Sequence, residues 1–230
     1  MKKIPLSLEL AELLGAHMGD GTLYKTKYSM VWEIRGDIEE KEYYIGNICP
    51  LIKSVFGIEI KSKLRNSGKC NVWGIQLSKR EIINELLEYE MILGKKTHSA
   101  FIPKYIFNAE DEIKQAFIRG LFDTDGCLRF DKNKKKGLNK YPKLEFGFAS
   151  IILRDSLKEL LDELSFSSYI WTDKATTAYK LCLAGIPKLE RWMVEIQPKN
   201  PKHLNKYEIW KRLGYYNAEV AQSGTAQIIV

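Results

Sequence analysis

The chain has 230 residues, with 36 lysines and arginines against 29 acidic residues, a formal charge of +7 and a hydrophobic fraction of 45%. This length supports one large domain or two small ones, and the hydrophobic content can fill a sizeable core without disulfide staples. The basic balance favours a polyanionic partner such as nucleic acid, although basic proteins without such a partner are also common. The four cysteines include no C-x-x-C pair, which argues against a zinc module and for reduced thiols.

The N-terminal sequence and the hydropathy pattern argue against secretion and membrane insertion. Lys2 and Lys3 are followed by Pro5, Ser7 and Glu9 instead of the apolar core of a signal peptide. No window approaches the roughly 18 continuous apolar residues of a membrane span. We therefore expect an intracellular protein without membrane contact, cytoplasmic unless it works in an organelle.

In chain order, the first predicted element is a helix over residues 8 to 19, whose end carries LLGAHMGDG (Leu13 to Gly21). The following segment TLYKTKYSMVWEIRGD has a turn-like centre and alternating apolar residues, which predict a β-hairpin. KEYYIGNICPLIKSVFG has apolar residues at helical spacing, with Pro50 as a candidate kink. A second hairpin, IEIKSKLRNSGKCNVWGIQLS, turns at N-S-G-K, and a short helix closes this half.

The second half repeats this order of elements. FIPKYIFNAED (Phe101 to Asp111) forms the junction to a helix over residues 113 to 124, within which IRGLFDTDG (Ile118 to Gly126) begins. A hairpin with a strongly basic tip follows in LRFDKNKKKGLNKYPKLEFGF, then the helix ILRDSLKELLDELSF and the hairpin SYIWTDKATTAYKLCLAG. The tail after Tyr216 has no usable period, and we expect it to be loosely held.

The two glycine-containing segments match at an offset of 105 residues, and the downstream sequence runs in parallel. Because tight turns join only antiparallel strands, we predict an α+β fold of two pseudo-symmetric αββαββα repeats with antiparallel sheets. The predicted division is residues 1–106 for the first repeat, 107–216 for the second and 217–230 for the tail.

The repeated segments also predict how the two helices meet. Gly15 and Gly19 share a helical face, as do Gly120 and Thr124, so the helices can approach backbone to backbone. Asp20 and Asp125 would then lie side by side at the helix C-termini, where the helix dipole and mutual repulsion disfavour two carboxylates. Hard divalent cations such as Mg²⁺ would stabilise the pair. The alternative for each Asp-Gly is a simple helix cap with a solvated aspartate.

These segments resemble the paired LAGLIDADG motifs of homing endonucleases, and the resemblance extends over roughly residues 8 to 216. FIRGLFDTDG is close to the form in archaeal members, and FIPKYIF and NPKHLNKYEIW (Asn200 to Trp210) are also similar to family sequences. The first motif departs from the consensus, since His17 and Met18 stand where the family has an apolar residue and an acid.

The resemblance implies particular site residues. The acid before the final glycine binds metal in the family, which here means Asp20 and Asp125, and the preceding carbonyls of Gly19 and Thr124 also contact metal. A basic residue from each half stands near the metals, and our candidates are Lys206 and Lys180 in the second half and Lys95 or Lys96 in the first. We expect Asp123 to cap its helix or make a local hydrogen bond, and no histidine to act as a catalyst.

The resemblance further implies a monomeric, single-chain enzyme with a DNA-binding saddle and two central motif helices. Such an enzyme makes a staggered double-strand cut in a long, pseudo-symmetric target by metal-dependent phosphodiester hydrolysis, in intron or mobile-element homing. Mg²⁺ is the expected cofactor, Mn²⁺ a substitute, and Ca²⁺ an ion that supports binding with little cleavage. Double-stranded DNA is the expected partner, with host intron RNA as a second candidate.

Several predicted strands place cations on one face and apolar residues on the other, as in IEIKSKLR. A twisted β-ribbon with such a face can enter the major groove, although an ordinary solvated sheet face gives the same pattern. The flexible tip from Lys132 to Lys140 is better suited to gripping phosphates than to reading bases. The candidate DNA-binding residues are Arg35, Lys61, Lys63, Arg65, Gln76, Arg129, Lys132, Lys134, Lys135, Lys136, Lys143 and Lys180.

Other classes of function fit less well. Gly94-Lys95-Lys96-Thr97 lacks the first glycine of a phosphate-binding P-loop, because Tyr89 stands there. The main alternative is a non-cleaving binder of the same fold, either an RNA maturase or a transcriptional regulator, and the presence of both acids argues against it. The terminal residues Met1 and Val230 do not match the splicing residues of an intein, so we expect a free-standing or intron-encoded protein.

Overall fold

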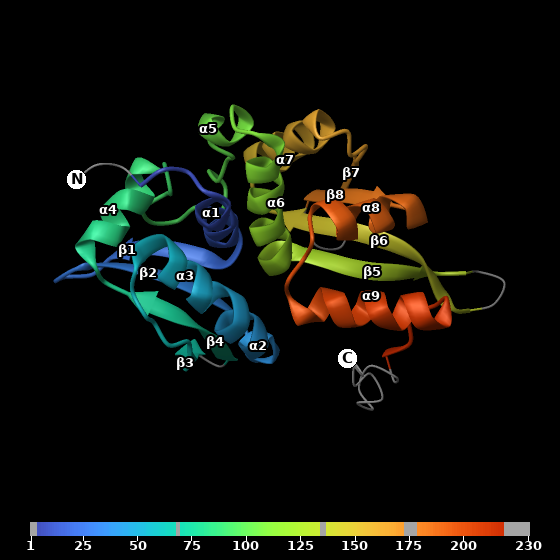
Figure 1. The fold of residues 1–230 in the computed structure, drawn as a ribbon, viewed down its shortest axis with the longest axis horizontal. Coiled ribbons are helices and arrows are strands. Elements are labelled where there is room, and N and C mark those ends of the chain that lie inside the picture. The colour runs from blue at the N-terminus through green and yellow to red at the C-terminus, as the bar shows by residue number, and fades with distance from the viewer. Residues whose placement is uncertain (1–3, 68–69, 134–136, 173–178, 219–230) are drawn as a thin grey trace.

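The computed structural model describes residues 4–67, 70–133, 137–172 and 179–218, which form two similar halves (Figure 1). The elements of the first half are α1 (Leu8–Asp20), β1 (Gly21–Lys25), β2 (Met30–Asp37), η1 (Ile38–Glu40), α2 (Lys41–Tyr43), η2 (Tyr44–Ile48), α3 (Cys49–Phe56), β3 (Lys63–Ser67), β4 (Cys70–Leu77) and α4 (Arg80–Glu88). After the short α5 (Lys104–Phe107), the second half contains α6 (Asp111–Asp125), β5 (Gly126–Lys132), β6 (Asn139–Phe148), α7 (Ile151–Glu163), β7 (Tyr169–Thr172), β8 (Tyr179–Ala184), α8 (Ile186–Glu195) and α9 (Pro201–Leu213).

Each half contains one antiparallel four-stranded sheet. The strand orders are β1-β2-β4-β3 and β5-β6-β8-β7, so each sheet consists of two hairpins joined through their second strands. The predicted α+β fold of two αββαββα repeats is therefore confirmed. The predicted division after residue 106 falls inside α5, a four-residue helix that leads from one half into the other.

The motif helices α1 and α6 lie together between the two sheets (Figure 1). Ser7 begins α1, because its side chain accepts a hydrogen bond from the backbone N–H of Leu10 at 3.2 Å. Leu10 and Leu14 of α1, and Phe117 and Leu121 of α6, are fully buried in the shared core. Burial on nearly all sides fixes these two helices as the centre of the molecule.

Two local features differ from the sequence-based expectation. The kink expected at Pro50 takes the form of a π-helical turn over Tyr44–Ile48, just before α3. A proline ring clashes with the carbonyl four residues earlier, here Gly46, so a wider turn accommodates it. Strand β3 begins at Lys63 rather than near Ile58, and Leu64, expected on the apolar face, is 49% exposed. Lys61 therefore lies in the loop before the strand.

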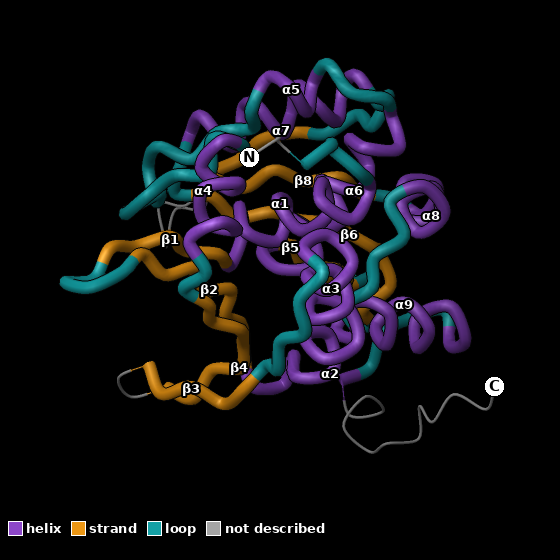
Figure 2. The backbone as a smooth tube through the Cα atoms, turned by 60° about the vertical axis from the view of Figure 1, so that its left-hand side comes forward, coloured by secondary structure: helices purple, strands orange, loops and turns teal. Residues whose placement is uncertain are grey.

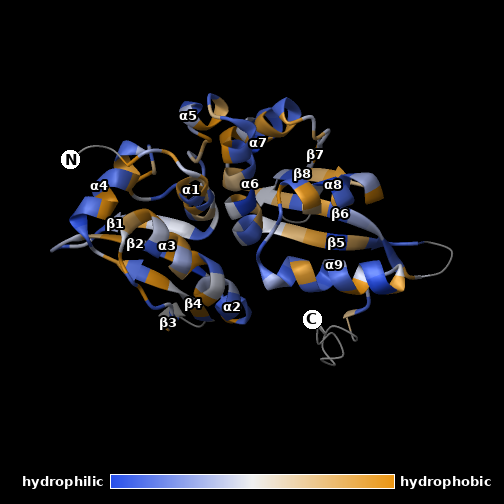
Figure 3. Ribbon diagram, viewed as in Figure 1, coloured by the Kyte–Doolittle hydropathy of each residue, from blue (hydrophilic) through white to orange (hydrophobic). Residues whose placement is uncertain are grey.

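Helices cover one side of each sheet, while the opposite faces carry polar side chains. In the turned view of Figure 2, the β1–β2 and β3–β4 hairpins extend on the side away from α8 and α9. In Figure 3, hydrophilic and hydrophobic residues alternate along the ribbon of α9, as expected for a helix that packs one face against the core. No helix in the described ranges is both long and apolar enough to cross a membrane.

Tyr216, the last residue of the second repeat, is attached to the second sheet. Tyr216 forms an isolated antiparallel bridge with Asn139, its N–H donating to the Asn139 carbonyl at 2.7 Å. The Tyr216 ring also stacks on Phe130 at 5.5 Å between centroids. Residues 219–230 lie outside the described residues.

Candidate active site

Glycines allow the two motif helices to touch through their backbones. A Cβ atom on Gly15 would lie 2.0 Å from the carbonyl oxygen of Phe117, and one on Gly120 would lie 1.9 Å from that of Glu12. Both distances are far below van der Waals contact, so no side chain fits at either position. The backbone-to-backbone approach predicted from the glycine spacing is confirmed.

This crossing brings the last residues of α1 and α6 together. A Cβ atom on Gly19 would lie 2.1 Å from Oγ1 of Thr124 and 3.3 Å from Cγ of Asp125, so the Asp125 carboxyl group lies against α1. Asp20 is half-buried, whereas Asp125 reaches solvent through an open depression. The two motif carboxylates therefore share one site at the C-terminal ends of the helices.

The surroundings disfavour negative charge on both aspartates. Loss of water contacts, reinforced by the charges of Asp125 and Glu40, raises the pKa of Asp20 to about 7. Loss of water contacts also raises the pKa of Asp125, although Lys96 and Lys202 oppose the shift. A cation placed between the two groups would relieve this unfavourable charge.

A lysine from each half caps the C-terminus of a motif helix. Lys96 donates hydrogen bonds to the carbonyl of His17 at 2.7 Å and to that of Gly19 at 2.6 Å, and it also donates to the carbonyl of Met18. Lys202 donates to the carbonyl of Thr124 at 3.0 Å. Lys96 follows Asp20 by 76 residues and Lys202 follows Asp125 by 77, so the two lysines are equivalent in the repeat. Burial lowers the pKa of Lys96 to about 8, although Asp125 and Asp20 favour its charged form.

Glu40 supplies a third carboxylate at the Asp20 side of the site. A Cβ atom on Gly36 would lie 2.3 Å from Oε2 of Glu40, 3.0 Å from the hydroxyl of Tyr44 and 3.1 Å from Oδ2 of Asp20, so three oxygens converge where this glycine has no side chain. The other oxygen of Glu40 accepts hydrogen bonds from Lys202 at 2.7 Å and from Nδ2 of Asn200 at 2.8 Å. Glu40 thus links the first half to the start of α9.

Sequence reasoning missed Glu40, Tyr44 and Lys202. The repeat spacing could have identified Lys202, because it lies at nearly the same distance from its motif as Lys96 does. Glu40 belongs to a capping box with Asp37, a local pattern that carries no catalytic signal of its own. Tyr44 lies in η2, and its hydroxyl reaches the site at the space beside Gly36.

Of the two first-half candidates, the structure places Lys96 at the motif, while Lys95 is exposed. In the second half, Lys206 contacts the carbonyl of Leu128 at 3.3 Å, and Lys202 takes the expected position beside Thr124. Lys180 pairs with Glu145 at 3.2 Å. One helical turn of α9 separates Lys202 from Lys206 and turns the latter toward β5, so Lys202 is a further candidate for the second half beside Lys206 and Lys180.

Asp123 and His17 have structural partners. Asp123 is fully buried, and its Oδ2 accepts a hydrogen bond from the backbone N–H of Lys199 at 2.8 Å. The expected local bond is thus replaced by one to the segment between α8 and α9, which the sequence places 76 residues away. His17 is buried as well, and its Nδ1 accepts a hydrogen bond from the Trp32 indole at 3.1 Å.

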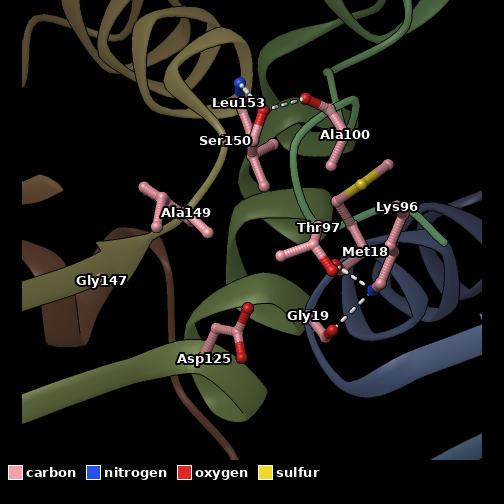
Figure 4. A pocket seen from close by; sticks show the side chains of 11 residues that line it. Met18, Gly19, Lys96, Thr97, Ala100, Asp125, Gly147, Ala149, Ser150 and Leu153 are labelled. Carbon is pink, nitrogen blue, oxygen red and sulfur yellow. Dashed lines mark hydrogen bonds between the residues drawn. The ribbon is translucent and has the colours of Figure 1, made fainter. Parts of the chain in front are cut away.

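A cavity of about 220 Å³ opens beside Asp125 (Figure 4). Asp125 and Lys96 flank this cavity, and Thr97, Gly147 and Ser150 contribute to its wall. The opening gives a phosphate group or hydrated ion access to the Asp125 carboxylate.

The donor set of the site suits a hard divalent cation. Asp20, Asp125 and Glu40 offer carboxylate oxygens, and the carbonyls of Gly19 and Thr124 each keep a second lone pair beside the lysine hydrogen bond. In the described ranges, no three His, Cys, Asp or Glu side chains form a preassembled metal cluster. A Mg²⁺ ion that retains several waters needs only one or two carboxylates together with substrate phosphates, so the residues fit such an ion.

Both sheets carry cations in register across neighbouring strands. The cross-strand register aligns Arg35, Gly74 and Lys63 in one row of the first sheet, and Arg129 with Lys143 in the second. Arg65 donates to Gln76 at 2.5 Å and Lys143 pairs with Asp131 at 2.9 Å, so acids and amides already hold several of these cations. Lys132 ends β5, and Lys134, Lys135 and Lys136 lie outside the described residues.

Comparison with known proteins agrees with this geometry. Residues 112–196 match the family model of a LAGLIDADG-like domain. The chain is 27% identical over 198 residues to an uncharacterized protein of Methanocaldococcus jannaschii, covering 82% of this chain and 21% of that protein. It is 24% identical over 219 residues to a DNA polymerase of Thermococcus sp. (strain GE8), covering 94% of this chain and 11% of the polymerase. The chain thus spans only about a tenth to a fifth of the length of these relatives.

Solved structures show the same fold. I-DmoI in complex with DNA and Ca superposes with a TM-score of 0.60 at 19% identity, covering 88% of this chain and 98% of that chain. The I-LtrWI LAGLIDADG homing endonuclease bound to target DNA gives a TM-score of 0.59 at 14% identity, covering 95% and 92%. The resemblance inferred from the two motifs is therefore confirmed. The second half holds a LAGLIDADG-like domain, and the whole chain has the fold of the single-chain, two-motif LAGLIDADG homing endonucleases.

Proposed function

We propose that this chain is a divalent-metal-dependent endonuclease that cuts both strands of one long DNA site. The observation that carries the proposal is the pairing of Asp20 with Asp125 at the ends of two touching helices, with a lysine at the carbonyl before each acid. Two equivalent acids suit two scissile phosphates, one on each strand.

The chemistry assigned to the chain is phosphodiester hydrolysis. Asp20, Asp125 and the carbonyls of Gly19 and Thr124 would hold divalent ions, which when bound supply an activated water and stabilise the leaving oxygen. Lys96 and Lys202 place positive charge beside the two acids and offset the charge that develops on each phosphate. Glu40 orients Lys202 through their 2.7 Å ion pair.

Mg²⁺ is the proposed cofactor, with Mn²⁺ as a substitute. Ca²⁺ should support DNA binding with little cleavage, because its longer and looser coordination misplaces the attacking water. The structures of I-DmoI in complex with DNA and Mn, and with DNA and Ca, support the use of divalent ions.

The polar sheet faces would bind double-stranded DNA. Two related sheets, one on each side of the motif helices, suit a long and pseudo-symmetric target and a staggered cut in intron or mobile-element homing. The structures of I-DmoI and I-LtrWI as complexes with DNA support DNA binding by this fold. We propose that the chain acts as a cytoplasmic monomer. Host intron RNA is a further proposed partner.

The test is a cleavage assay beside a binding assay on one target. The target is selected by incubating the parent protein with a randomised DNA library and Mg²⁺ and sequencing the cut ends. Asp20→Asn and Asp125→Asn should each abolish double-strand cleavage and retain binding, because removing one negative charge lessens the repulsion within the pair.

Lys158→Ala, an exposed substitution on α7 far in sequence from either motif, is the matched control and should cleave as the parent does. If either asparagine variant linearises a plasmid at the parent rate, the two-acid site is wrong. A parent protein that binds DNA and cuts none would favour the non-cleaving binder.

A further inference from the structure

Each sheet has a cation at the same cross-strand position, but the two sheets carry it on different strands. Ile34 and Phe146 pair with Gly21 and Gly126, the glycines that follow the two motif aspartates. The next residues toward the strand ends are Arg35 in β2 and Gly147 in β6. Arg35 pairs across the sheet with Gly74, whereas Gly147 pairs with Lys180. Each half thus has one cation and one glycine at this cross-strand pair, on exchanged strands.

The glycine leaves the space that the cation uses. A Cβ atom on Gly147 would lie 3.1 Å from Nζ of Lys180, and its three nearest neighbours all belong to the Lys180 side chain. A Cβ atom on Gly74 would lie 3.0 Å from Cγ of Arg35 and only 2.2 Å from the carbonyl oxygen of Ile34. Moving the cation to the glycine position is therefore sterically possible in the second half, where only the Lys180 side chain is in the way. In the first half the backbone of Ile34 blocks it.

A buried glutamate holds each cation. Nε of Arg35 lies 3.1 Å from Oε2 of Glu33, and Nζ of Lys180 lies 3.2 Å from Oε1 of Glu145. Glu33 and Glu145 are both 5% exposed and occupy equivalent positions, two residues before Arg35 and Gly147. The second oxygen of Glu145 also pairs with Nη1 of Arg129 at 3.5 Å, so Glu145 holds Lys180 through Oε1 and Arg129 through Oε2. A buried carboxylate requires cationic partners, so each glutamate constrains the cations that it contacts.

Both cations remain partly accessible beside the motif acids. Their side chains are 35% exposed for Arg35 and 24% for Lys180. Gly36, next to Arg35 in β2, lies against Asp20, and Gly147 lines the cavity that contains Asp125. Neighbouring strand residues point to opposite faces, so Arg35 lies on the other face of β2 from the Gly36 contact, whereas the Lys180 side chain lies over Gly147 at the cavity. A phosphate bound on the polar sheet face would meet one of these cations near the motif acid of the same half.

We propose that Glu33 and Glu145 are equivalent positioning residues, each of which holds one cation, Arg35 or Lys180, against the DNA backbone phosphate beside the motif acid of its own half. The inference rests on the proposed function, because it requires DNA on the polar sheet faces. It extends that function by adding one fixed phosphate contact on each strand, separate from Lys96 and Lys202.

The experiment is a double-mutant cycle of DNA binding, in which protein variants are combined with modified targets, and it requires no cleavage. Binding is measured in Ca²⁺ with targets that carry a single neutral methylphosphonate at each phosphate near the centre. Lys180→Gly should bind unmodified DNA about tenfold more weakly than the parent does, which is the scale of a hydrogen bond to a charged group. At one phosphate of one strand, replacement by a methylphosphonate should cause no further loss of affinity in this variant, because the contact is already missing. Arg35→Ala should show the same coupling at a phosphate of the other strand.

The exchanged variant separates positioning from general charge. Lys180→Gly with Gly147→Arg returns a cation to the same place from the opposite strand, so it should restore most of the lost affinity and the same methylphosphonate coupling. Glu145→Gln should reduce the coupling between Lys180 and that phosphate, although the loss of one negative charge favours DNA binding in general. Lys158→Ala should show no coupling, and melting temperatures identify variants that fail to fold.

The outcomes of these measurements decide whether the proposal holds. Coupling of Lys180→Gly to no phosphate, equal coupling to both strands, or full coupling in Glu145→Gln overturns it, and the last result would show that Glu145 does not position Lys180. Strand-specific coupling in a protein that never cuts DNA supports the positioning assignment and contradicts the proposed cleavage. Strand-specific slowing of single-turnover nicking by Lys180→Gly would support both.

Discussion

A neutral histidine inside the second half links the stability of the protein to pH. His203 is buried and stacks on Phe122 with ring centroids 4.3 Å apart, and its Nε2 hydrogen bonds to the Phe122 carbonyl at 3.1 Å. In the described structure its Nδ1 has no hydrogen-bond partner. Burial, with the nearby Lys202, places the pKa of His203 well below 6.5.

The sign of the effect follows from proton uptake on unfolding. Below about pH 6.5 the unfolded chain binds a proton at His203 and the folded chain does not, so stability falls as pH decreases. Asp20, whose pKa is raised, acts in the opposite direction, so the comparison of variant with parent isolates His203. His203→Gln should lose less stability than the parent between pH 7 and pH 5. Urea unfolding at several pH values measures this, and equal pH slopes would contradict the assignment.

At the scale of elements, the crossing of α1 and α6 depends on two glycines. Gly15→Ala and Gly120→Ala each place a methyl group about 2 Å from a carbonyl oxygen of the other helix, so the helices must separate. Overpacking of this kind typically costs about 1–3 kcal/mol, which is a fall of several degrees in melting temperature for a chain of this size. Cleavage should fall further than stability, because separation of the helices also separates Asp20 from Asp125.

Gly46→Ala is the matched control for the glycine substitutions. A Cβ atom on Gly46 would meet nothing within 4 Å, so this alanine should be neutral or slightly stabilising. Thermal unfolding followed by circular dichroism compares the three variants. A motif-helix variant as stable as the Gly46 variant would show that the crossing tolerates wider spacing.

At the scale of the whole molecule, one chain already contains both halves of the site. Asp20 and Asp125 meet through the internal contact between α1 and α6, so a second copy is unnecessary. We expect small-angle scattering at micromolar concentration to give the mass and dimensions of a monomer, with and without DNA. A concentration-dependent dimer mass would count against this assembly.

The basic balance of the chain should make DNA binding depend steeply on salt. Each phosphate neutralised by a lysine adds about 0.9 to the slope of log affinity against log salt concentration. Replacing Lys134, Lys135 and Lys136 together with alanine should flatten this slope and weaken binding to all sites alike, since lysine contacts with phosphates carry no sequence information. An unchanged slope, or a changed ranking of targets, would refute the assignment of this tip.

The sequence alone predicted the architecture because the relevant signals are local and repeated. The glycine spacing of the motifs and the hairpin turns each depend on a few neighbouring residues, and their recurrence at 105 residues distinguishes them from chance. The same repetition singled out Asp20 and Asp125 as the paired acids, and the structure places them together.

Only the tertiary structure decided which cations accompany those acids. Lys202 and Lys206 both lie on α9, and its packing turns one toward Thr124 and the other toward Leu128. Glu40 reaches the site through a contact 162 residues away in the chain, with Lys202. Surface lysines and acids have no sequence period that identifies their partners, because such partners are set by how the elements pack and not by the residues beside them.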